Sequence, residues 1–264
     1  MTVITLLTDF GLRDGYVGVM KGVIWGIAPH AQIADLTHAI APQNVAQGAL
    51  ALKRTAKYFP DGTIHVAVVD PGVGTSRRPL AARVGRQVFV GPDNGLFSLV
   101  LEGAERAGEA VHIIHLTERR FWLPEVSRVF HGRDIFSPVA AHLANGVNLD
   151  EMGPQLDGPV RLDLPRPEQL PGGGWRGQVI EVDYFGNLST NLERSHIERI
   201  ATPIVQIVGH EIHGLVGTFG DRPAGNLIAL FGTADDLVIA EVNGNAAKTL
   251  GIGLGAQVTV LLGA

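Results

Sequence analysis

The sequence predicts an α/β protein. We expect a layered α/β/α amino-terminal domain with a mostly parallel sheet, followed by a small all-β, barrel-like carboxyl-terminal domain. Over residues 3–144, short β-branched runs alternate with segments whose apolar residues recur at helical spacing, a pattern typical of βαβ units. After a Pro/Gly-rich stretch at residues 165–174 the apolar residues alternate with period two, as in antiparallel strands. We therefore predict domains at residues 1–164 and 175–264, joined by a linker at 165–174.

The first domain is predicted to alternate strands and helices. Apolar runs predict strands at residues 3–7, 33–36, 65–69 and 88–90. Helical spacing and helix-ending residues predict helices at 16–27, 45–58, 96–101 and 139–144. Two of the strands run directly into a carboxylate, Asp9 and Asp70. Ligands bind at the carboxyl ends of strands in open α/β sheets, so we expect these two carboxylates to share one rim.

The second domain is predicted to consist of short strands separated by glycine turns. The strands are expected at residues 177–183, 204–208, 227–231, 237–241 and 257–262. This pattern favours a small barrel or sandwich. A turn at residues 183–187 joins a carboxylate, an aromatic ring and an amide. It is either an ordinary hairpin turn or a site for the edge of a purine ring, because an asparagine amide both donates and accepts hydrogen bonds.

The segment that follows the third strand contains the strongest candidate for chemistry. Asp70 is followed by a proline and by glycines at 72 and 74, which allow the backbone to approach a ligand closely. Arg77 and Arg78 come next, and either guanidinium could fold back toward Asp70. The pair is either a surface salt bridge or part of a functional site.

Two further polar clusters precede predicted helices. Asp93 and Asn94 lie in an Asp-Asn-Gly turn, which favours a role in the turn itself over a role in a site. His131 and Arg133 stand before the helix at 139–144, and His131 is the best general-base candidate among the ten histidines. Asp134 and Pro138 are expected to stabilise the start of that helix.

Composition and missing motifs exclude several classes of function. The net charge of -5 gives no attraction for nucleic acid or an anionic membrane. There is no cysteine, so disulfides and thiolate zinc sites are excluded. No phosphate-binding glycine loop, His-Glu-x-x-His or Gly-x-Ser-x-Gly motif occurs. No signal peptide or membrane span of about 18 apolar residues is apparent. We therefore expect a cytoplasmic protein in which zinc and nucleoside triphosphates are disfavoured as ligands.

Six short motifs, taken together, resemble the S-adenosyl-L-methionine (SAM) hydroxide adenosyltransferases, which are also called SAM hydrolases and are related to the fluorinase and chlorinase. They lie at residues 7–11 (Leu-Thr-Asp-Phe-Gly), 14–18, 68–78, 91–95, 130–136 and 183–187, and they span both domains in the family's order. The resemblance implies a homotrimer in which one subunit's amino-terminal domain and its neighbour's carboxyl-terminal domain hold the substrate. It also implies that SAM is the substrate, so that no cofactor and no metal site are expected.

The resemblance implies a role for each candidate residue. The water-activating residues would be Asp70, Arg77 and His131. Ribose and methionine would be contacted by Asp9, Asp14, Tyr16 and Asp183, and by Thr233 near the methionine carboxylate. Adenine would be contacted by Phe185, Phe219, Asn187, Asn245 and Ala246, and Asn94 would complete the substrate-binding set.

The implied activity is hydrolysis of SAM to adenosine and L-methionine by attack of water at the ribose C5′. Two alternatives remain: a SAM-dependent halide transferase, and a non-catalytic SAM or adenosine sensor. The carboxylate of Asp70 opposes halide transfer, because a fixed negative charge repels an anion at close contact by about 4 kcal/mol at an effective dielectric of about 20. Gln43 stands where the resemblance places the tryptophan of the fluorinase halide pocket.

Overall fold

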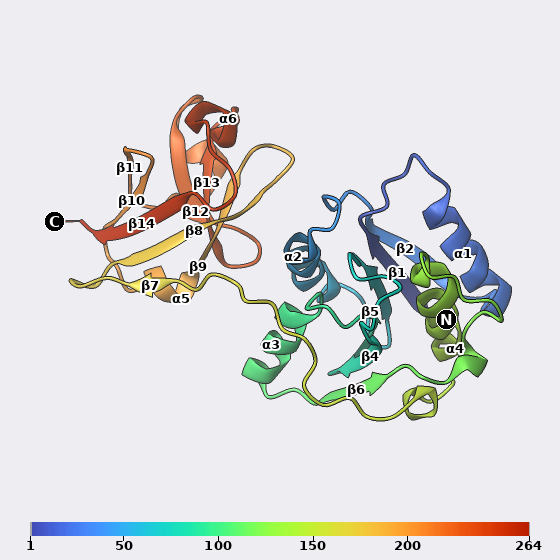
Figure 1. Cartoon of the computed structure of the whole chain (residues 1–264). Coiled ribbons are helices and arrows are strands. Elements are labelled where there is room, and N and C mark those ends of the chain that lie inside the picture. The colour runs from blue at the N-terminus through green and yellow to red at the C-terminus, as the bar shows by residue number, and fades with distance from the viewer. Residues whose placement is uncertain (1, 264) are drawn as a thin grey trace. The chain divides into compact units, whose positions relative to one another are not determined.

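The chain folds into two compact units, each with its own sheet and its own hydrophobic core. The computed structural model describes residues 2–263, with the first unit ending at Asp163 and the second beginning at Leu164. Figure 1 shows the second unit in yellow to red. Within residues 2–263, no helix combines the length and the apolar character that a bilayer crossing needs.

The first unit is built on a six-stranded sheet. Its strands are β1 (Val3–Thr8), β2 (Gln32–Thr37), β3 (Ile64–Val68), β4 (Pro79–Val84), β5 (Gln87–Pro92) and β6 (Val111–His115). Their spatial order is β2-β1-β3-β5-β4-β6. The pairs β1–β2, β1–β3 and β3–β5 are parallel, whereas β4 pairs antiparallel with both β5 and β6.

The prediction of a mostly parallel sheet was therefore wrong, and the sheet is mixed. The cause is the connection from β4 to β5, in which only Gly85 and Arg86 separate the two strands. A two-residue link makes a hairpin, because a parallel connection needs a crossover of about a dozen residues. Gly85 adopts the positive φ (54°) that such a tight turn requires.

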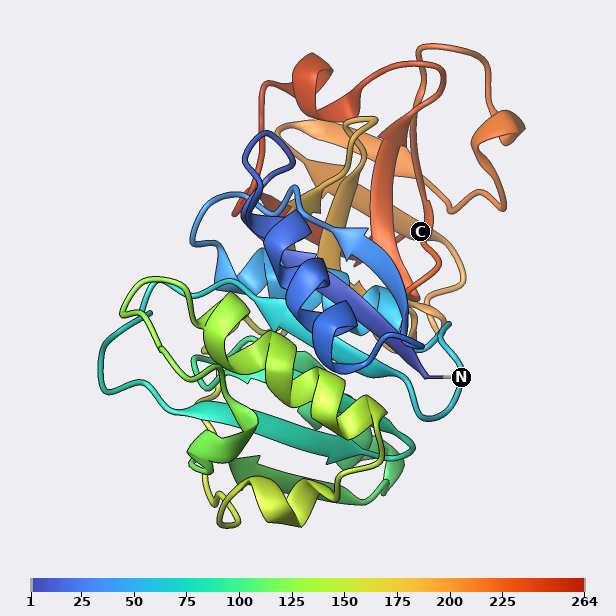
Figure 2. The same ribbon diagram turned by 90° about the vertical axis from the view of Figure 1, so that its right-hand side faces the viewer.

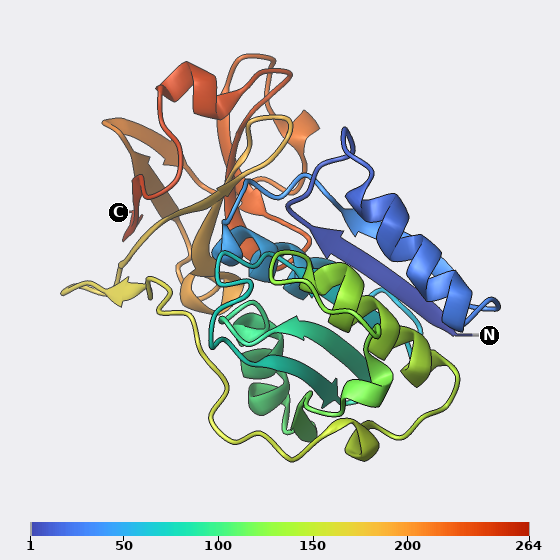
Figure 3. The same ribbon diagram turned by 45° about the vertical axis from the view of Figure 1, so that its right-hand side comes forward.

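Helices cover both faces of this sheet (Figure 3). They are α1 (Tyr16–Ile27), α2 (Val45–Ala56), α3 (Ser98–Ala107) and α4 (Ser137–Ala144). Figure 2 shows α1 in blue and α4 in green together on one face. Alternate residues of a strand point to opposite faces, so Val66 packs in the cluster that contains α1 and α4. Its neighbour Ala67 packs in the cluster that contains α2 and α3.

Short helical turns complete the first unit. They are η1 (Arg119–Phe121), the π-helical turn η2 (Gly132–Phe136) and η3 (Leu149–Met152). The turn η2 runs directly into α4, and Gly132 O accepts a hydrogen bond from Ser137 Oγ at 2.7 Å. Single π-turns within helices are frequent at functional sites. His131 immediately precedes this one.

The second unit is an antiparallel, nearly closed barrel-like sheet. Its strands are β7 (Glu168–Gln169), β8 (Trp175–Val182), β9 (Leu188–Glu193), β10 (Pro203–Ile207), β11 (His210–His213), β12 (Leu227–Phe231), β13 (Asp236–Glu241) and β14 (Gln257–Leu262). The order is β11-β10-β14-β8-β9-β13-β12, with β7 pairing with β8. Short helices α5 (Arg194–Ile197), η4 (Phe219–Asp221) and α6 (Ala246–Leu250) connect the strands. Alternate strand residues form one core that includes Val179, Val205 and Val258.

Candidate active site

Asp70, Arg77 and His131 form one connected cluster in the first unit. Arg77 Nε donates to Asp70 Oδ1 at 3.0 Å, and Arg77 Nη2 donates to Asp70 Oδ2. The same Nη2 lies 2.8 Å from His131 Nδ1. The Arg77 and Asp70 side chains are only 7% and 4% exposed. The structure thus brings together the three residues to which the family resemblance assigns water activation.

Glycine at position 74 lets two loops meet at this cluster. Gly74 has a φ of 75°, and a Cβ placed on it would lie 2.2 Å from the carbonyl oxygen of Arg128. The loop after Asp70 therefore packs directly against the backbone of the segment that leads to His131. Any other residue at this position would be strained and would also push the two loops apart.

A buried carboxylate orders the segment before His131. Asp134 is fully buried and accepts from Arg133 Nε at 2.5 Å and from the backbone N–H of Ser127 at 2.9 Å. Arg133 also lies over the ring of Phe130. Asp134 and Arg133 therefore support the loop that presents His131.

The hydrogen bonds determine which atom of the cluster can take a proton. A guanidinium has no acceptor and stays protonated, so Nδ1 of His131 accepts from Arg77 and the ring proton resides on Nε2. Burial and the positive charge of Arg77 both lower the pKa of His131, so the ring is neutral at neutral pH. The acceptor lone pair of this neutral ring, on Nδ1, is already used by the hydrogen bond from Arg77. The Asp70 carboxylate has about four lone-pair positions and gives two of them to Arg77, so it retains free acceptor capacity.

Asp9 lies on the same rim as Asp70. Strands β1 and β3 are neighbours, and Thr8 pairs with Val68, so both carboxylates follow the same edge of the sheet. Asp9 Oδ2 accepts from the backbone N–H of Gln43 at 2.8 Å. Sequence reasoning missed this donor, because a backbone N–H leaves no side-chain signal. Gln43 adopts a left-handed conformation with φ 65° to present it.

Tyr16 belongs to an aromatic cluster beside His131. Its ring packs edge-on against Phe130 at 5.4 Å and Phe10 at 6.1 Å between ring centroids. Phe130 directly precedes His131, so Tyr16 lies beside the segment that carries the histidine. Asp14 is exposed on the loop before α1.

The turn that contains Asn94 supports the backbone around Asp70. Asn94 Nδ2 donates to the carbonyl of Val69 at 2.8 Å. Its neighbour Asp93 is buried and accepts from Arg78 Nε at 2.7 Å. The two adjacent arginines therefore have different partners, since Arg77 binds Asp70 and Arg78 binds Asp93.

In the second unit, the turn at residues 183–187 is organised by its own carboxylate. Asp183 Oδ1 accepts from the backbone N–H groups of Phe185 and Asn187, each at 2.9 Å. Asp183 Oδ2 accepts from Asn187 Nδ2 at 2.8 Å. The ring of Phe185 is 69% exposed, so an aromatic face is available to a ligand.

The segment at 245–247 packs against this turn. Gly186 has a φ of 85°, and a Cβ on it would lie 2.1 Å from Asn245 Cγ. The N–H of Ala247 donates to the carbonyl of Gly186 at 3.0 Å. The predicted adenine contacts at Asn187, Asn245 and Ala246 are thus gathered in one place. Phe219 lies in η4 and Thr233 in the turn between β12 and β13.

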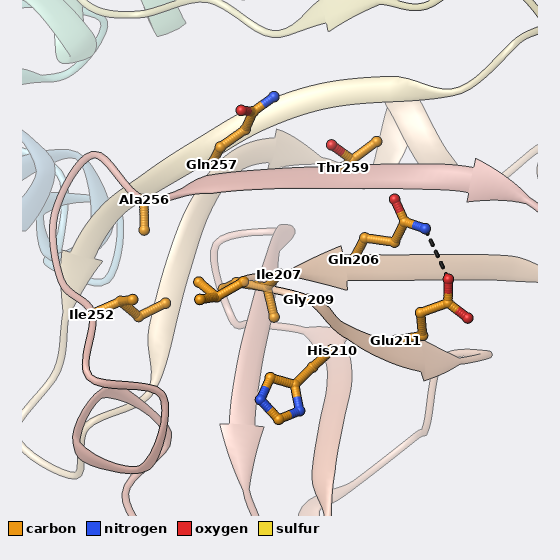
Figure 4. Close-up of a pocket in the computed structure, with 10 residues that line it drawn as sticks. Gln206, Ile207, Gly209, His210, Glu211, Ile252, Ala256, Gln257 and Thr259 are labelled. Carbon is orange, nitrogen blue, oxygen red and sulfur yellow. Dashed lines mark hydrogen bonds between the residues drawn. The ribbon is translucent and has the colours of Figure 1, made fainter.

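A surface hollow in the second unit lies elsewhere, along β10, β11 and β14 (Figure 4). Within it Gln206 Nε2 donates to Glu211 Oε1 at 2.9 Å. None of the site residues predicted from the sequence lines this hollow. In the part of the chain that the structure describes, no three His, Asp or Glu residues are grouped so that they could hold a metal ion.

Comparison with known proteins agrees with this geometry. Residues 4–153 match the family model for the SAM hydroxide adenosyltransferase N-terminal domain, and residues 177–259 match the C-terminal domain. A (R)-S-adenosyl-L-methionine hydrolase from Thermus thermophilus is 39% identical over 265 residues, covering 99% of this chain and 100% of the relative. One from Salinispora arenicola is 38% identical over 98% of both chains.

More distant relatives and solved structures give the same picture. A fluorinase from Actinoplanes is 28% identical over 75% of this chain and 74% of the relative. The crystal structure of an uncharacterized conserved protein from Thermotoga maritima superposes with a TM-score of 0.90 at 36% identity, covering 98% of this chain and 99% of that one. Both domains of this chain, in the same order, match the family models over most of their length. The chain belongs to the SAM hydroxide adenosyltransferase family.

Proposed function

We propose that this protein hydrolyses the (R) epimer of S-adenosyl-L-methionine to adenosine and L-methionine. The observation that carries the proposal is the Asp70–Arg77–His131 cluster. It lies in a chain that is 38–39% identical, over nearly its whole length, to proteins named (R)-S-adenosyl-L-methionine hydrolase. The sulfonium sulfur of SAM bears three different substituents and a lone pair, so the substrate exists as two epimers at sulfur.

The chemistry needs a prepared nucleophile and no general acid. The water oxygen bonds to C5′ of the ribose while the C5′–S bond breaks. The electron pair of the broken bond stays on sulfur and gives the neutral thioether of methionine. Water has a pKa of about 15.7, too high for a carboxylate to deprotonate it before attack. A water proton therefore passes to the base as the C–O bond forms, and that base afterwards releases the proton to solvent.

Asp70 is the base in this proposal, because it is the member of the cluster with free acceptor capacity. Arg77 holds the carboxylate through two hydrogen bonds, which fixes its direction. His131 fixes Arg77 in turn through its Nδ1 atom. A carboxylate held in a fixed direction can place the water oxygen in line with C5′ and the sulfur. Alignment of the reacting atoms is a major source of rate enhancement in displacements.

The remaining site residues are proposed to bind the substrate. Asp9 accepts hydrogen bonds from the ribose hydroxyls, and Asp183 pairs with the methionine ammonium. Further substrate contacts are assigned to Asp14, Tyr16, Asn94, Phe185, Asn187, Phe219, Thr233, Asn245 and Ala246. We also propose a homotrimer in which the first unit of one subunit and the second unit of its neighbour bind one substrate molecule. The cytoplasmic location and the absence of a cofactor stay predictions.

The competing functions are opposed by Asp70. A halide transferase would have to bring an anion beside this carboxylate, and the fluorinase relatives are more distant than the hydrolases. A sensor would have no use for a nearly buried, oriented base.

An assay with each purified SAM epimer tests the proposal. We expect adenosine and methionine to form from (R)-SAM faster than from (S)-SAM, without added metal and unaffected by a chelator. A matched pair of variants isolates the cluster: Arg77→Lys should lose most activity, and Arg78→Lys should keep it because its partner is Asp93. Binding of SAM without any adenosine would favour the sensor, and halogenated adenosine in the presence of chloride or fluoride would favour the transferase.

A further inference from the structure

His38 contacts both ends of the short loop that carries Asp9. Its Nδ1 atom lies 2.9 Å from Thr8 Oγ1, and its backbone carbonyl accepts from the N–H of Gly11 at 2.8 Å. Thr8 Oγ1 also accepts from the N–H of Phe10 at 3.2 Å. The loop from Thr8 to Gly11 is therefore tied at both ends to one residue.

The His38 ring is tied in turn to a surface ion pair. The side chain is 2% exposed, and its Nε2 lies 3.1 Å from Asp35 Oδ1, close but not well aligned for a hydrogen bond. Asp35 Oδ2 lies 2.7 Å from Lys21 Nζ. Burial raises the pKa of Asp35, but the interactions with Lys21 and His38 outweigh burial and keep that pKa below its usual value.

The ionised Asp35 determines the proton arrangement. A carboxylate only accepts, so it favours the His38 tautomer with the proton on Nε2. Nδ1 then accepts from the hydroxyl of Thr8, and the oxygen of that hydroxyl accepts from Phe10. The Thr8 hydroxyl proton and the Phe10 amide proton each have one acceptor in this series, so two hydrogen bonds restrain the loop.

We propose that His38 is a positioning residue for substrate binding: through Thr8 it holds the Asp9 carboxylate in the orientation that meets the ribose hydroxyls. This rests on the proposed function, in which Asp9 binds the ribose. The second constraint on Asp9 is the N–H of Gln43, five residues after His38. The segment from His38 to Gln43 thus restrains both the loop that carries Asp9 and the Asp9 side chain itself.

Strand β1, which contains Thr8, also contributes to a second threonine–histidine contact, and this one should not influence Asp9. Thr5 Oγ1 lies 2.7 Å from His65 Nδ1, and both residues are fully buried. This Thr–His contact has the same atoms and a similar length as the Thr8–His38 contact. Thr5 lies in the middle of β1, away from the loop that begins at Thr8. Substitution of Thr5 therefore serves as a control for the loss of a buried threonine hydroxyl that is remote from Asp9.

The first test compares Thr8→Val with Thr5→Val. We expect Thr8→Val to raise KM for (R)-SAM by about threefold to tenfold, the range set by the net contribution of one hydrogen bond, with kcat within about twofold. Thr5→Val should lower the melting temperature but leave KM unchanged. Thr8→Ser, which keeps the hydroxyl, should restore KM. Equal KM values in Thr8→Val and the wild-type protein would overturn the proposal.

The second test separates positioning from packing at His38. Asparagine places its amide where Nδ1 lies and can still bond Thr8, whereas the amide of glutamine reaches the Nε2 position. Positioning through Thr8 predicts a KM closer to wild type for His38→Asn than for His38→Gln. A role in packing alone predicts the opposite order, because glutamine is nearer to histidine in volume, and that result would refute the proposal.

Amide hydrogen exchange distinguishes failure of this proposal from failure of the proposed function. A wild-type protein that releases no adenosine from either epimer would contradict the function. Exchange at Gly11, whose N–H donates to the His38 carbonyl and not to Thr8, does not depend on turnover. Faster exchange at Gly11 in Thr8→Val than in Thr5→Val would support the restraint of the loop by His38, and equal rates would overturn it even in an active hydrolase.

Discussion

His65 should make the first unit sensitive to acid. It lies in β3 with no exposed surface, its ring stacks on Phe89 at 4.8 Å between centroids, and Nδ1 contacts Thr5. Nε2 is buried without a well-aligned partner. Burial lowers the pKa of His65 from 6.5 to about 4, and an interaction with Gln87 offsets only part of that effect. Protonation would place a charge in the core with no carboxylate to compensate it.

The sign and size of the effect follow from proton linkage. Between pH 6.5 and about 4 the unfolded chain binds a proton at His65 that the folded chain does not, so stability is complete above pH 6.5 and falls as the pH falls. Each pH unit between the two pKa values costs about 1.4 kcal/mol. The full loss is about 3 kcal/mol, of which about 2 kcal/mol is lost between pH 7 and pH 5.

Urea unfolding at pH 7 and pH 5 measures this loss against His65→Asn, whose amide can still bond Thr5 but does not titrate. A Trp175→Phe background leaves Trp25 and Trp122 to report on the first unit alone. The other histidines with lowered pKa values, His131 among them, contribute equally to both proteins. We expect the wild-type protein to lose about 2 kcal/mol more than the variant between the two pH values. The same loss in both proteins would refute the assignment to His65.

Three further changes have defined outcomes. Asp70→Asn should keep the Kd for SAM within about tenfold but lower kcat by about 10²- to 10⁴-fold, because the amide cannot accept the water proton; near-normal single-turnover rates would transfer the role of base to His131. Asp183→Ala should raise KM for SAM at least about tenfold, since it removes three hydrogen bonds that shape the adenine turn; a wild-type KM would mean that the turn is only a hairpin. Val208→Asn should stabilise the second unit by about 0.5–1 kcal/mol, because Val208 and Gly209 both have positive φ in a two-residue hairpin turn that favours Asn-Gly; an unchanged melting temperature would show that the valine conformation is not strained.

The sequence predicted strand and helix positions best where the local pattern was strong. The helix expected at 16–27 forms over those residues, and the strand expected at 3–7 forms with one more residue. Strand β4 was missed, because Pro79 and Arg83 interrupt its apolar pattern. Its antiparallel direction comes from the tight turn at Gly85, and β4 makes the sheet mixed. The direction of a strand depends on its neighbours, which no local window of sequence contains.

The site was predictable in its members but not in its connections. The run from Asp70 to Arg78 indicated a carboxylate with an arginine partner but left both arginines open, and the family resemblance assigned Arg77. The structure gives the reason for that choice, since Arg78 is bound by Asp93. The support of Asp9 by Gln43 and His38 had no sequence signal, because both residues act partly through backbone atoms.

By itself, the sequence determined the residue types at the ends of β1 and β3, the glycines that let the loops turn, and the motifs that identify the family. These features depend on neighbouring residues, whose backbone preferences and chemistry act locally. Only the tertiary structure decided that Arg77 joins Asp70 to His131, which lies 54 positions further along the chain. That contact occupies the free nitrogen of the histidine and leaves the carboxylate able to accept a proton. The occupancy of a lone pair depends on distances and directions between residues that folding brings together.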